Sequence, residues 1–112
     1  AGRKAPRLLL NSDIPFDAIF AGNDMMAVDL MSELRAAGRD IGTDVLVAGF
    51  DDIPLARYVT PGLTTVHSDI TRVGSTAAEM MLRMMKGETL DQGESLIIEP
   101  TLAIRESSGG QA

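Results

Sequence analysis

A short apolar run that ends in two acids constrains the fold of this chain more than any other feature. Residues 45–49 read VLVAG, and the acids Asp51 and Asp52 follow after one aromatic residue. A run this short, rich in β-branched residues and bounded by polar ones, predicts a strand buried on both faces, as in a parallel sheet. Residues 18–22 have the same design, and Asn23 follows them. Because ligands of open α/β sheets bind beyond the carboxyl ends of the strands, these polar residues are candidates for a binding site.

Helical periodicity follows the strand candidates. Apolar residues recur at helical spacing from residue 24 onward, and Gly38 stands where a left-handed residue would end that helix. Residues 63–67 are β-branched and predict a third strand. Residues 69–86 predict a long helix with a buried stripe made of Ile70, Val73, Ala77, Met80, Met81 and Met84. The alternation of strands and helices predicts an α/β fold with a parallel sheet and right-handed crossovers.

The carboxyl-terminal part of the chain carries weaker signals. Residues 96–99 and 101–105 are short strand candidates separated by Pro100. The last six residues, 107–112, are small and polar and are expected to form a disordered tail.

Composition narrows the classes of function. The 112 residues allow one ordinary domain at most, and a net charge of −6 gives no footprint for nucleic acid. The chain has no cysteine and one histidine, so we expect no metal site and no cofactor. No apolar run approaches the roughly 20 residues that cross a bilayer, and the basic N-terminus lacks the apolar core of a signal peptide. A soluble, cytoplasmic protein is the expectation.

The acids at the strand ends have two possible roles. A carboxylate there can accept hydrogen bonds from vicinal hydroxyls or from the N–H groups of a base, but it can also cap the following helix. We favour Asp51 as the residue that faces the crevice and Asp52 as a cap. Asn23, which can donate and accept, suits a polyol or nucleobase, whereas Asp24 is assigned to the helix N-terminus.

The only histidine and the serine after it are weaker candidates. His67 has no second histidine to act with, so a structural role at the end of a strand is favoured over a role as base or ligand. Ser68 is a helix cap first and a ligand contact second.

Four segments in register resemble the LacI/GalR family of bacterial transcription regulators: residues 16–27 (FDAIFAGNDMMA), 47–56 (VAGFDDIPLA), 60–66 (TPGLTTV) and 104–107 (IRES). Their order and spacing match the family from about residue 3 to residue 107. The resemblance implies part of a periplasmic-binding-protein-like (type I) effector domain. That domain has two Rossmann-like α/β lobes with a small molecule bound between them.

The resemblance also implies particular roles for residues at the strand ends. Asn23 and Asp51 match the positions that contact the effector, Ser68 matches a frequent effector contact, and Ile70 would line the cleft. Some relatives carry a longer amide and an aromatic residue at the last two positions, so the effector is expected to be a sugar or nucleoside-like molecule of undetermined identity.

The family's dimer interface would explain apolar residues that lie off the core stripe. The resemblance assigns Met25, Val28, Tyr58 and Val59 to a surface that faces a second copy of the chain. We therefore expect a homodimer.

The resemblance further implies an incomplete fold. Residues 1–67 would form most of the C-terminal lobe, residues 68–99 a helix and strand that belong to the N-terminal lobe, and residues 100–106 a strand that crosses back. The family's DNA-binding helix-turn-helix has no counterpart in these residues, so the chain corresponds to a C-terminal fragment. Operator DNA would be bound only through that absent domain. A helix over residues 69–86 without its sheet is expected to favour self-association.

Two other functions share parts of this pattern. A periplasmic sugar-binding protein of a transport system has the same fold, but its usual motifs match residues 60–66 less well. A small enzyme that uses Asp51 and Asp24 as paired carboxylates would lose turnover on Asp51→Asn with folding intact. The regulator without enzymatic activity is the favoured interpretation.

Overall fold

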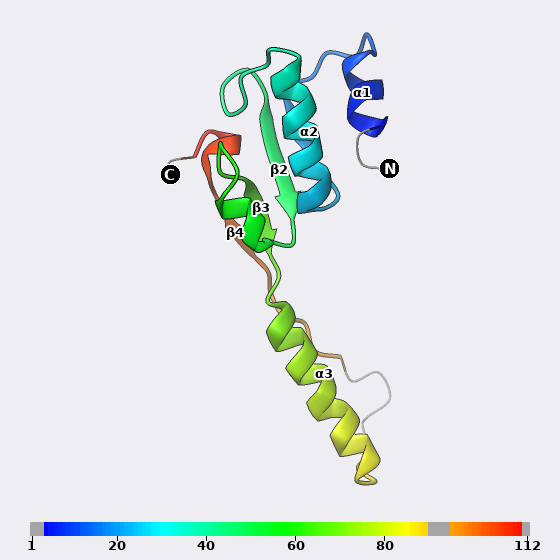
Figure 1. The fold of residues 1–112 in the computed structure, drawn as a ribbon. Helices are drawn as coiled ribbons and strands as arrows, with labels where there is room; N and C mark the ends of the chain where they lie inside the picture. Colours follow the sequence, from blue (N-terminus) through cyan, green and yellow to red (C-terminus); the bar gives the residue numbers. More distant parts are fainter. Residues whose placement is uncertain (1–3, 90–94, 111–112) are drawn as a thin grey trace. The chain divides into compact units, whose positions relative to one another are not determined.

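The computed structural model describes residues 4–89 and 95–110, and contacts divide the chain into two compact units (Figure 1). The first unit consists of Ala1–His67 and Thr101–Ala112, and the second of Ser68–Pro100. The elements of the first unit are α1 (Lys4–Leu10), β1 (Ala18–Phe20), α2 (Asp24–Ala36), β2 (Leu46–Phe50), η1 (Pro54–Arg57), β3 (Thr64–His67), β4 (Thr101–Ala103) and η2 (Glu106–Ser108). The second unit contains α3 (Ile70–Met85).

The first unit is built on a four-stranded sheet with strand order β1-β2-β3-β4. β1, β2 and β3 are parallel, and β4 runs antiparallel to β3. The register pairs Phe20 with Ala48, and Phe50 with Val66. The predicted α/β fold with a parallel sheet is therefore confirmed, because the three strands predicted from their apolar runs are neighbours in one sheet.

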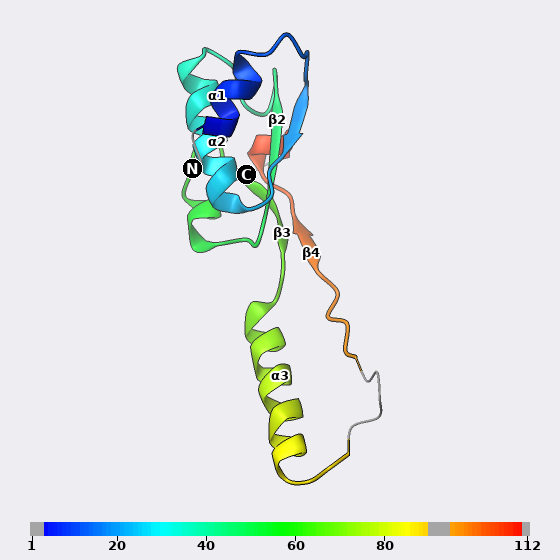
Figure 2. The same cartoon turned by 90° about the vertical axis from the view of Figure 1, so that its right-hand side faces the viewer.

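Both α-helices of the first unit lie on the same side of this sheet, as Figure 2 shows. α2 packs directly on β2 with its apolar stripe, which includes the buried Leu30 and Leu34, and Val47 of β2 is buried beneath it. α1 packs against α2 and buries Pro6. Each fully buried leucine contributes about 1.5–3 kcal/mol through removal of apolar surface from water. α2 ends as predicted, with Gly38 in the left-handed conformation at φ 76°.

The opposite face of the sheet is apolar and exposed. Phe20 is 65% exposed, and Phe50 and Leu102 are also exposed. Their register partners, Ala48 and Val66, are only partly buried. Parallel sheets are normally covered on both faces, so this face has the composition of a surface that packs against something else.

Three predictions about the carboxyl-terminal third are wrong. α3 forms over the predicted range, but none of its residues is buried, so the stripe that begins at Ile70 is not part of a core. Residues 96–99 form no strand, because the structure gives residues 95–100 no neighbouring strand with which to form a ladder. The tail expected to be disordered from residue 107 instead forms η2, with Ser107 fully buried.

Ser107 is ordered because its hydroxyl satisfies two buried backbone groups. It donates to the carbonyl of Val47 (2.6 Å) and accepts from the N–H of Thr64 (2.8 Å). Residues 111–112 of the predicted tail lie outside the described residues. In the described part of the chain no helix is both long and apolar enough to span a membrane.

Candidate functional site

The carboxyl ends of β1, β2 and β3 meet at one edge of the sheet, because the three strands are parallel neighbours. Asn23 follows β1, Asp51 and Asp52 follow β2, and His67 ends β3. The first unit therefore brings Asn23 and Asp51 to the same edge, where ligands bind in open α/β sheets.

Asn23 is the N-cap of α2. Its backbone is extended (φ −156°, ψ 171°), and its Oδ1 accepts a hydrogen bond from the N–H of Met26 at 2.9 Å. This bond satisfies one of the free N–H groups at the helix start. The capping bond uses one of the two lone pairs of the amide oxygen, so half-buried Asn23 can offer a ligand its two amide hydrogens and the remaining lone pair.

Asp24 is the first residue of α2, at the helix N-terminus as predicted, but its side chain makes no capping bond. Its side chain is fully buried, with Oδ1 accepting from the hydroxyl of Thr65 (2.5 Å) and Oδ2 from the N–H of Ile53 (2.9 Å). The carboxylate thus joins the start of α2 to β3 and to the loop after β2, and the positive end of the α2 dipole stabilises its charge. A fully buried carboxylate with both oxygens bound cannot serve as the second acid of the enzyme considered above.

Asp51 has the most unusual backbone at this edge. Its φ of 114° lies in a region that residues other than glycine rarely adopt, and Asp52 follows with φ 53°. The Asp51 side chain is exposed, while its N–H donates to the carbonyl of Val66 at 2.9 Å. Residues held in such conformations cluster at ligand sites, where the surrounding structure fixes them.

Asp52 also differs from its predicted role. The N-cap of η1 is Ile53, which makes no side-chain capping bond, and the Asp52 carboxylate instead binds the side chains of Arg105 and His67. Its Oδ1 lies 2.9 Å from Arg105 Nη2, and its Oδ2 lies 2.9 Å from His67 Nδ1. His67 thus has the structural role that was favoured for it.

The environment of Asp52 sets its protonation. Burial by itself raises the pKa of this carboxyl, but the hydrogen bonds from Arg105 and His67 and the charge of Arg105 outweigh it, so the pKa lies below its usual value. Asp52 is therefore an ionised carboxylate at neutral pH. The partnership with Arg105 was missed in the sequence, although Arg105 lies in the fourth segment of the family resemblance.

Ser68 and Ile70 lie in the second unit. The carbonyl of Ser68 accepts from the N–H of Ile70 at 2.8 Å, and Ile70 is 71% exposed. Ser68 does not cap this helix as predicted, because the N-cap is Asp69, whose Oδ1 accepts from the N–H of Arg72 at 3.0 Å.

The residues assigned to a dimer surface lie on α2 and in the loop after η1. Met25 and Tyr58 are exposed, Tyr58 to 80%, and Val28 and Val59 are half-buried. The two valines line one groove of about 290 Å³ together with Met31, Ser32, Arg35 and Thr60. The Arg35 guanidinium donates to the carbonyl of Thr60 and so ties the loop to α2.

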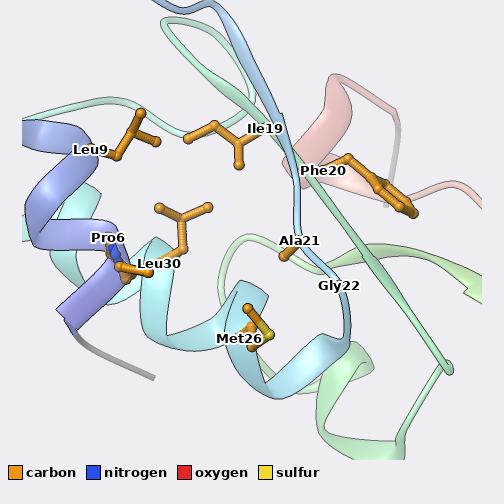
Figure 3. A pocket seen from close by; sticks show the side chains of 9 residues that line it. Pro6, Leu9, Ile19, Phe20, Ala21, Gly22, Met26 and Leu30 are labelled. Carbon is orange, nitrogen blue, oxygen red and sulfur yellow. The ribbon is translucent and has the colours of Figure 1, made fainter. Parts of the chain in front are cut away.

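A separate apolar pocket of about 170 Å³ lies between α1, β1 and α2 (Figure 3). Leu9, Ile19 and Leu30 point toward one another in it, while Phe20 points to the other side of the strand. None of the predicted ligand-binding residues lines this pocket. It offers few groups that could hydrogen-bond a polar ligand, and it is smaller than most ligand sites.

Among the described residues, no group of three or more histidine, aspartate, glutamate or cysteine side chains could hold a metal ion. At the strand ends, Asn23 offers an amide and Asp51 an exposed carboxylate for hydrogen bonding.

Comparison with known proteins agrees with this architecture. The model of the periplasmic binding protein-like domain family matches residues 2–108. The chain is 36% identical over 107 residues to the ribose operon repressor of Escherichia coli (strain K12) and 40% identical over 90 residues to the HTH-type transcriptional repressor PurR of Vibrio vulnificus (strain CMCP6). These alignments cover 96% and 80% of this chain, but only 32% and 27% of the respective relatives.

Solved structures give the same result. The transcriptional regulator CelR in complex with cellobiose superposes on 95% of this chain with a TM-score of 0.88 and 35% identity. The lac repressor dimer bound to operator and the anti-inducer ONPF superposes on 96% of it, with a TM-score of 0.87 and 26% identity. In both cases the match covers 32% of the other chain.

The chain belongs to the periplasmic binding protein-like domain family, and within it to the LacI family of transcriptional regulators. It spans about a third of the length of the relatives that it matches.

Proposed function

We propose that this chain is the effector-sensing and dimerising part of a LacI-type transcriptional repressor. The observation that carries the proposal is the pairing of Asn23 and Asp51 at the carboxyl edge of adjacent parallel strands, with Asp51 exposed and held in a rare backbone conformation. The effector would be a sugar or nucleoside-like molecule, without a cofactor or metal.

The two side chains offer complementary chemistry. An exposed carboxylate can accept two hydrogen bonds, from vicinal hydroxyls of a sugar or from N–H groups of a base. Asn23 would donate its amide hydrogens, which no capping bond uses. Ser68 would add a hydroxyl, and Ile70 would add apolar surface for the face of a ring. The names of a ribose operon repressor and of a regulator–cellobiose complex among the relatives support a sugar as the effector class.

The surface around Val28 and Val59 would bind a second copy of the chain, with Met25 and Tyr58 in the same interface. Apolar side chains that are exposed next to a groove are typical of such interfaces. The lac repressor, which superposes on this chain, forms a dimer in its complex with operator, and this supports the same assembly here.

Operator DNA would be bound by a helix-turn-helix outside these 112 residues, since the net charge of −6 is unsuited to binding phosphates. Effector binding would favour one of two dimer arrangements with different affinities for DNA. Such a ligand shifts the equilibrium only by its difference in affinity for the two states. The protein would act in the cytoplasm.

Isothermal titration calorimetry of the 112-residue chain against a panel of pentoses, hexoses, disaccharides and nucleosides tests the effector site. Asp51→Asn should weaken binding of the best ligand about tenfold or more, since it removes a charged acceptor. Asp13→Asn is the matched control, because Asp13 is also exposed but precedes β1 and so lies toward the opposite end of the strand. Equal affinities of the two variants, or no binding by any compound, would contradict the proposal.

A further inference from the structure

Asp52 is the centre of a cluster that the ligand-binding role of Asp51 does not require. Its side chain is 4% exposed, and each carboxylate oxygen has its own partner: Arg105 Nη2 on Oδ1 and His67 Nδ1 on Oδ2, both at 2.9 Å. An ionised carboxylate only accepts hydrogen bonds, so Nδ1 of His67 must carry the proton. The two bonds therefore fix the position of the carboxylate.

Hydrogen bonds from the backbone N–H groups of Asp51 and Asp52 to β3 hold the loop that carries the cluster. The N–H of Asp52 donates to Thr65 Oγ1 at 3.2 Å, and that of Asp51 donates to the carbonyl of Val66 at 2.9 Å. Arg105 also donates through Nη1 to the carbonyl of Leu63 at 2.8 Å. The loop with the rare backbone conformation is thus held by side chains and main chain of β3 and by Arg105, which closely follows β4.

The positions of these partners along the chain link the cluster to two strands. His67 is the last residue of the first unit before the chain passes into the second, and Arg105 closely follows β4, on which the chain returns. One buried carboxylate therefore connects the Asp51 loop to both strands by which the chain leaves and re-enters the first unit.

We propose that Asp52, His67 and Arg105 form a positioning cluster that holds the Asp51 loop in its ligand-binding conformation and couples it to β3 and β4. This inference rests on the proposed function of Asp51. Asp52 itself does not touch the ligand, since both of its carboxylate oxygens are bound within the cluster. Movement of either strand would change the position of Asp51, and a ligand bound to Asp51 would in turn favour one position of the strands.

His67 is the residue to vary, because its side chain is 46% exposed and its loss should not unfold the domain. His67→Leu removes the donor to Asp52. His67→Asn is the conservative variant, because the amide Nδ2 of asparagine lies the same number of bonds from Cα as Nδ1 of histidine and can donate to the same oxygen.

Amide hydrogen exchange measured by NMR on the 112-residue chain reads out the loop without a ligand. In His67→Leu the amides of Asp51 and Asp52 should exchange about tenfold faster, as expected from loss of one charge-assisted hydrogen bond, while those of α2 stay unchanged. His67→Asn should restore the rates. Unchanged loop amides, an equal acceleration throughout α2, or a failure of His67→Asn to restore the rates would each overturn the proposal.

The same variants titrated with the best ligand from the calorimetric panel test the coupling to Asp51. His67→Leu should weaken binding about tenfold and His67→Asn should restore it. Affinity that is unchanged in His67→Leu would overturn the coupling. If the unmodified chain bound no compound, the proposed function would fail, whereas the exchange experiment would still decide whether the cluster positions the loop.

Discussion

Asp24 and Asp52 show how two strand ends divide their polar residues between structure and site. At each end one acid is buried and bonded within the protein, Asp24 to Thr65 and Asp52 to Arg105. Next to each, Asn23 or Asp51 keeps hydrogen-bonding groups for other partners. The sequence singled out Asn23 and Asp51 as the candidates for ligand binding, but it assigned Asp52 to a helix cap and did not reveal the bonds of Asp24. Their partners lie 41 and 53 residues further along the chain, and local spacing cannot reveal such pairs.

The Asp52 cluster predicts a pH dependence of stability. The pKa of Asp52 is lower in the folded chain than in the unfolded one, so its ionisation stabilises the fold fully above the unfolded pKa, which is about 4. This contribution should be lost as the pH falls through the lower, folded pKa. Urea unfolding between pH 7 and pH 3 measures the free energy of unfolding along this range.

Asp52→Asn should flatten that profile at its acidic end. At pH 7 the variant should be about 1–3 kcal/mol less stable, since an amide has one oxygen to accept with and leaves either Arg105 or His67 without its acceptor. Asp13→Asn, at an exposed acid, should keep both the stability and the slope of the unmodified chain. An Asp52→Asn profile with the original slope would show that Asp52 does not contribute to the acid dependence.

Gly49 is required by the buried carboxylate of Asp24. A Cβ at this position would collide with Asp24 Oδ1 and lie 3.3 Å from the Cβ of Ala27. Gly49→Ala should therefore destabilise the first unit by about 1–3 kcal/mol, as overpacking of a core does. Gly74→Ala is the matched control, because a Cβ there meets no atom within 4 Å and should cause no loss. Equal midpoints of urea unfolding for the two variants would show that this close approach is not required.

At the scale of elements, α3 shows which properties of a helix the spacing of apolar residues can predict and which it cannot. The spacing of apolar residues predicted a helix and its start and end, because these depend on local geometry and caps. It also predicted burial, which depends on a partner surface. The second unit also contains residues 95–100. Two side chains of this segment, Leu96 and Ile98, line a pocket together with Val73, Ala77 and Met80 of α3.

Hydrogen exchange should reveal how weakly α3 is held. In a dilute sample its amides should be protected about 100-fold less than those of α2, since a helix with no buried residue gains little stability from tertiary packing. Protection should rise with protein concentration, because pairing of two copies would cover the apolar face. Met84→Gln should remove this concentration dependence, and Glu79→Gln on the polar face should not. Strong protection of α3 in a dilute, monomeric sample would contradict the expected self-association.

The proposed dimer surface makes a separate prediction at this scale. Val28→Asp should weaken dimerisation at least about tenfold, since it would replace an apolar side chain beside Val59 by a charge that loses its hydration when a second copy covers the groove. Analytical ultracentrifugation in a Met84→Gln background excludes association through α3. Ile14→Asp, at an exposed apolar residue outside this groove, is the control. If both variants had the dissociation constant of the background, the groove around Val28 would not be the dimer interface.

At the scale of the whole molecule, the parallel sheet was predictable and the fate of its last segments was not. The alternation of strands and helices predicted an α/β fold with a parallel sheet, but the strand order β1-β2-β3-β4 was not predicted. The absent strand at residues 96–99 and the ordered turn at Ser107 depend on long-range hydrogen bonding. A strand forms only beside another strand, and Ser107 is ordered by Val47 and Thr64, far earlier in the chain.

The location of the site was predictable only where it depends on the parallel strands. The parallel order of β1 and β2 placed Asn23 and Asp51 at one edge, whereas Ser68 and Ile70 were assigned by family resemblance and remain predictions.

An NMR titration with the best ligand of the sugar and nucleoside panel tests the central claim most directly, since it locates the ligand on the 112-residue chain. We expect the largest changes in amide chemical shift at residues 22–24 and 50–53, lost in Asp51→Asn and retained in Asp13→Asn. Shift changes confined to the apolar pocket around Leu9 and Ile19, or changes at residues 22–24 and 50–53 that persist in Asp51→Asn, would show that the carboxyl edge of the sheet is not the effector site.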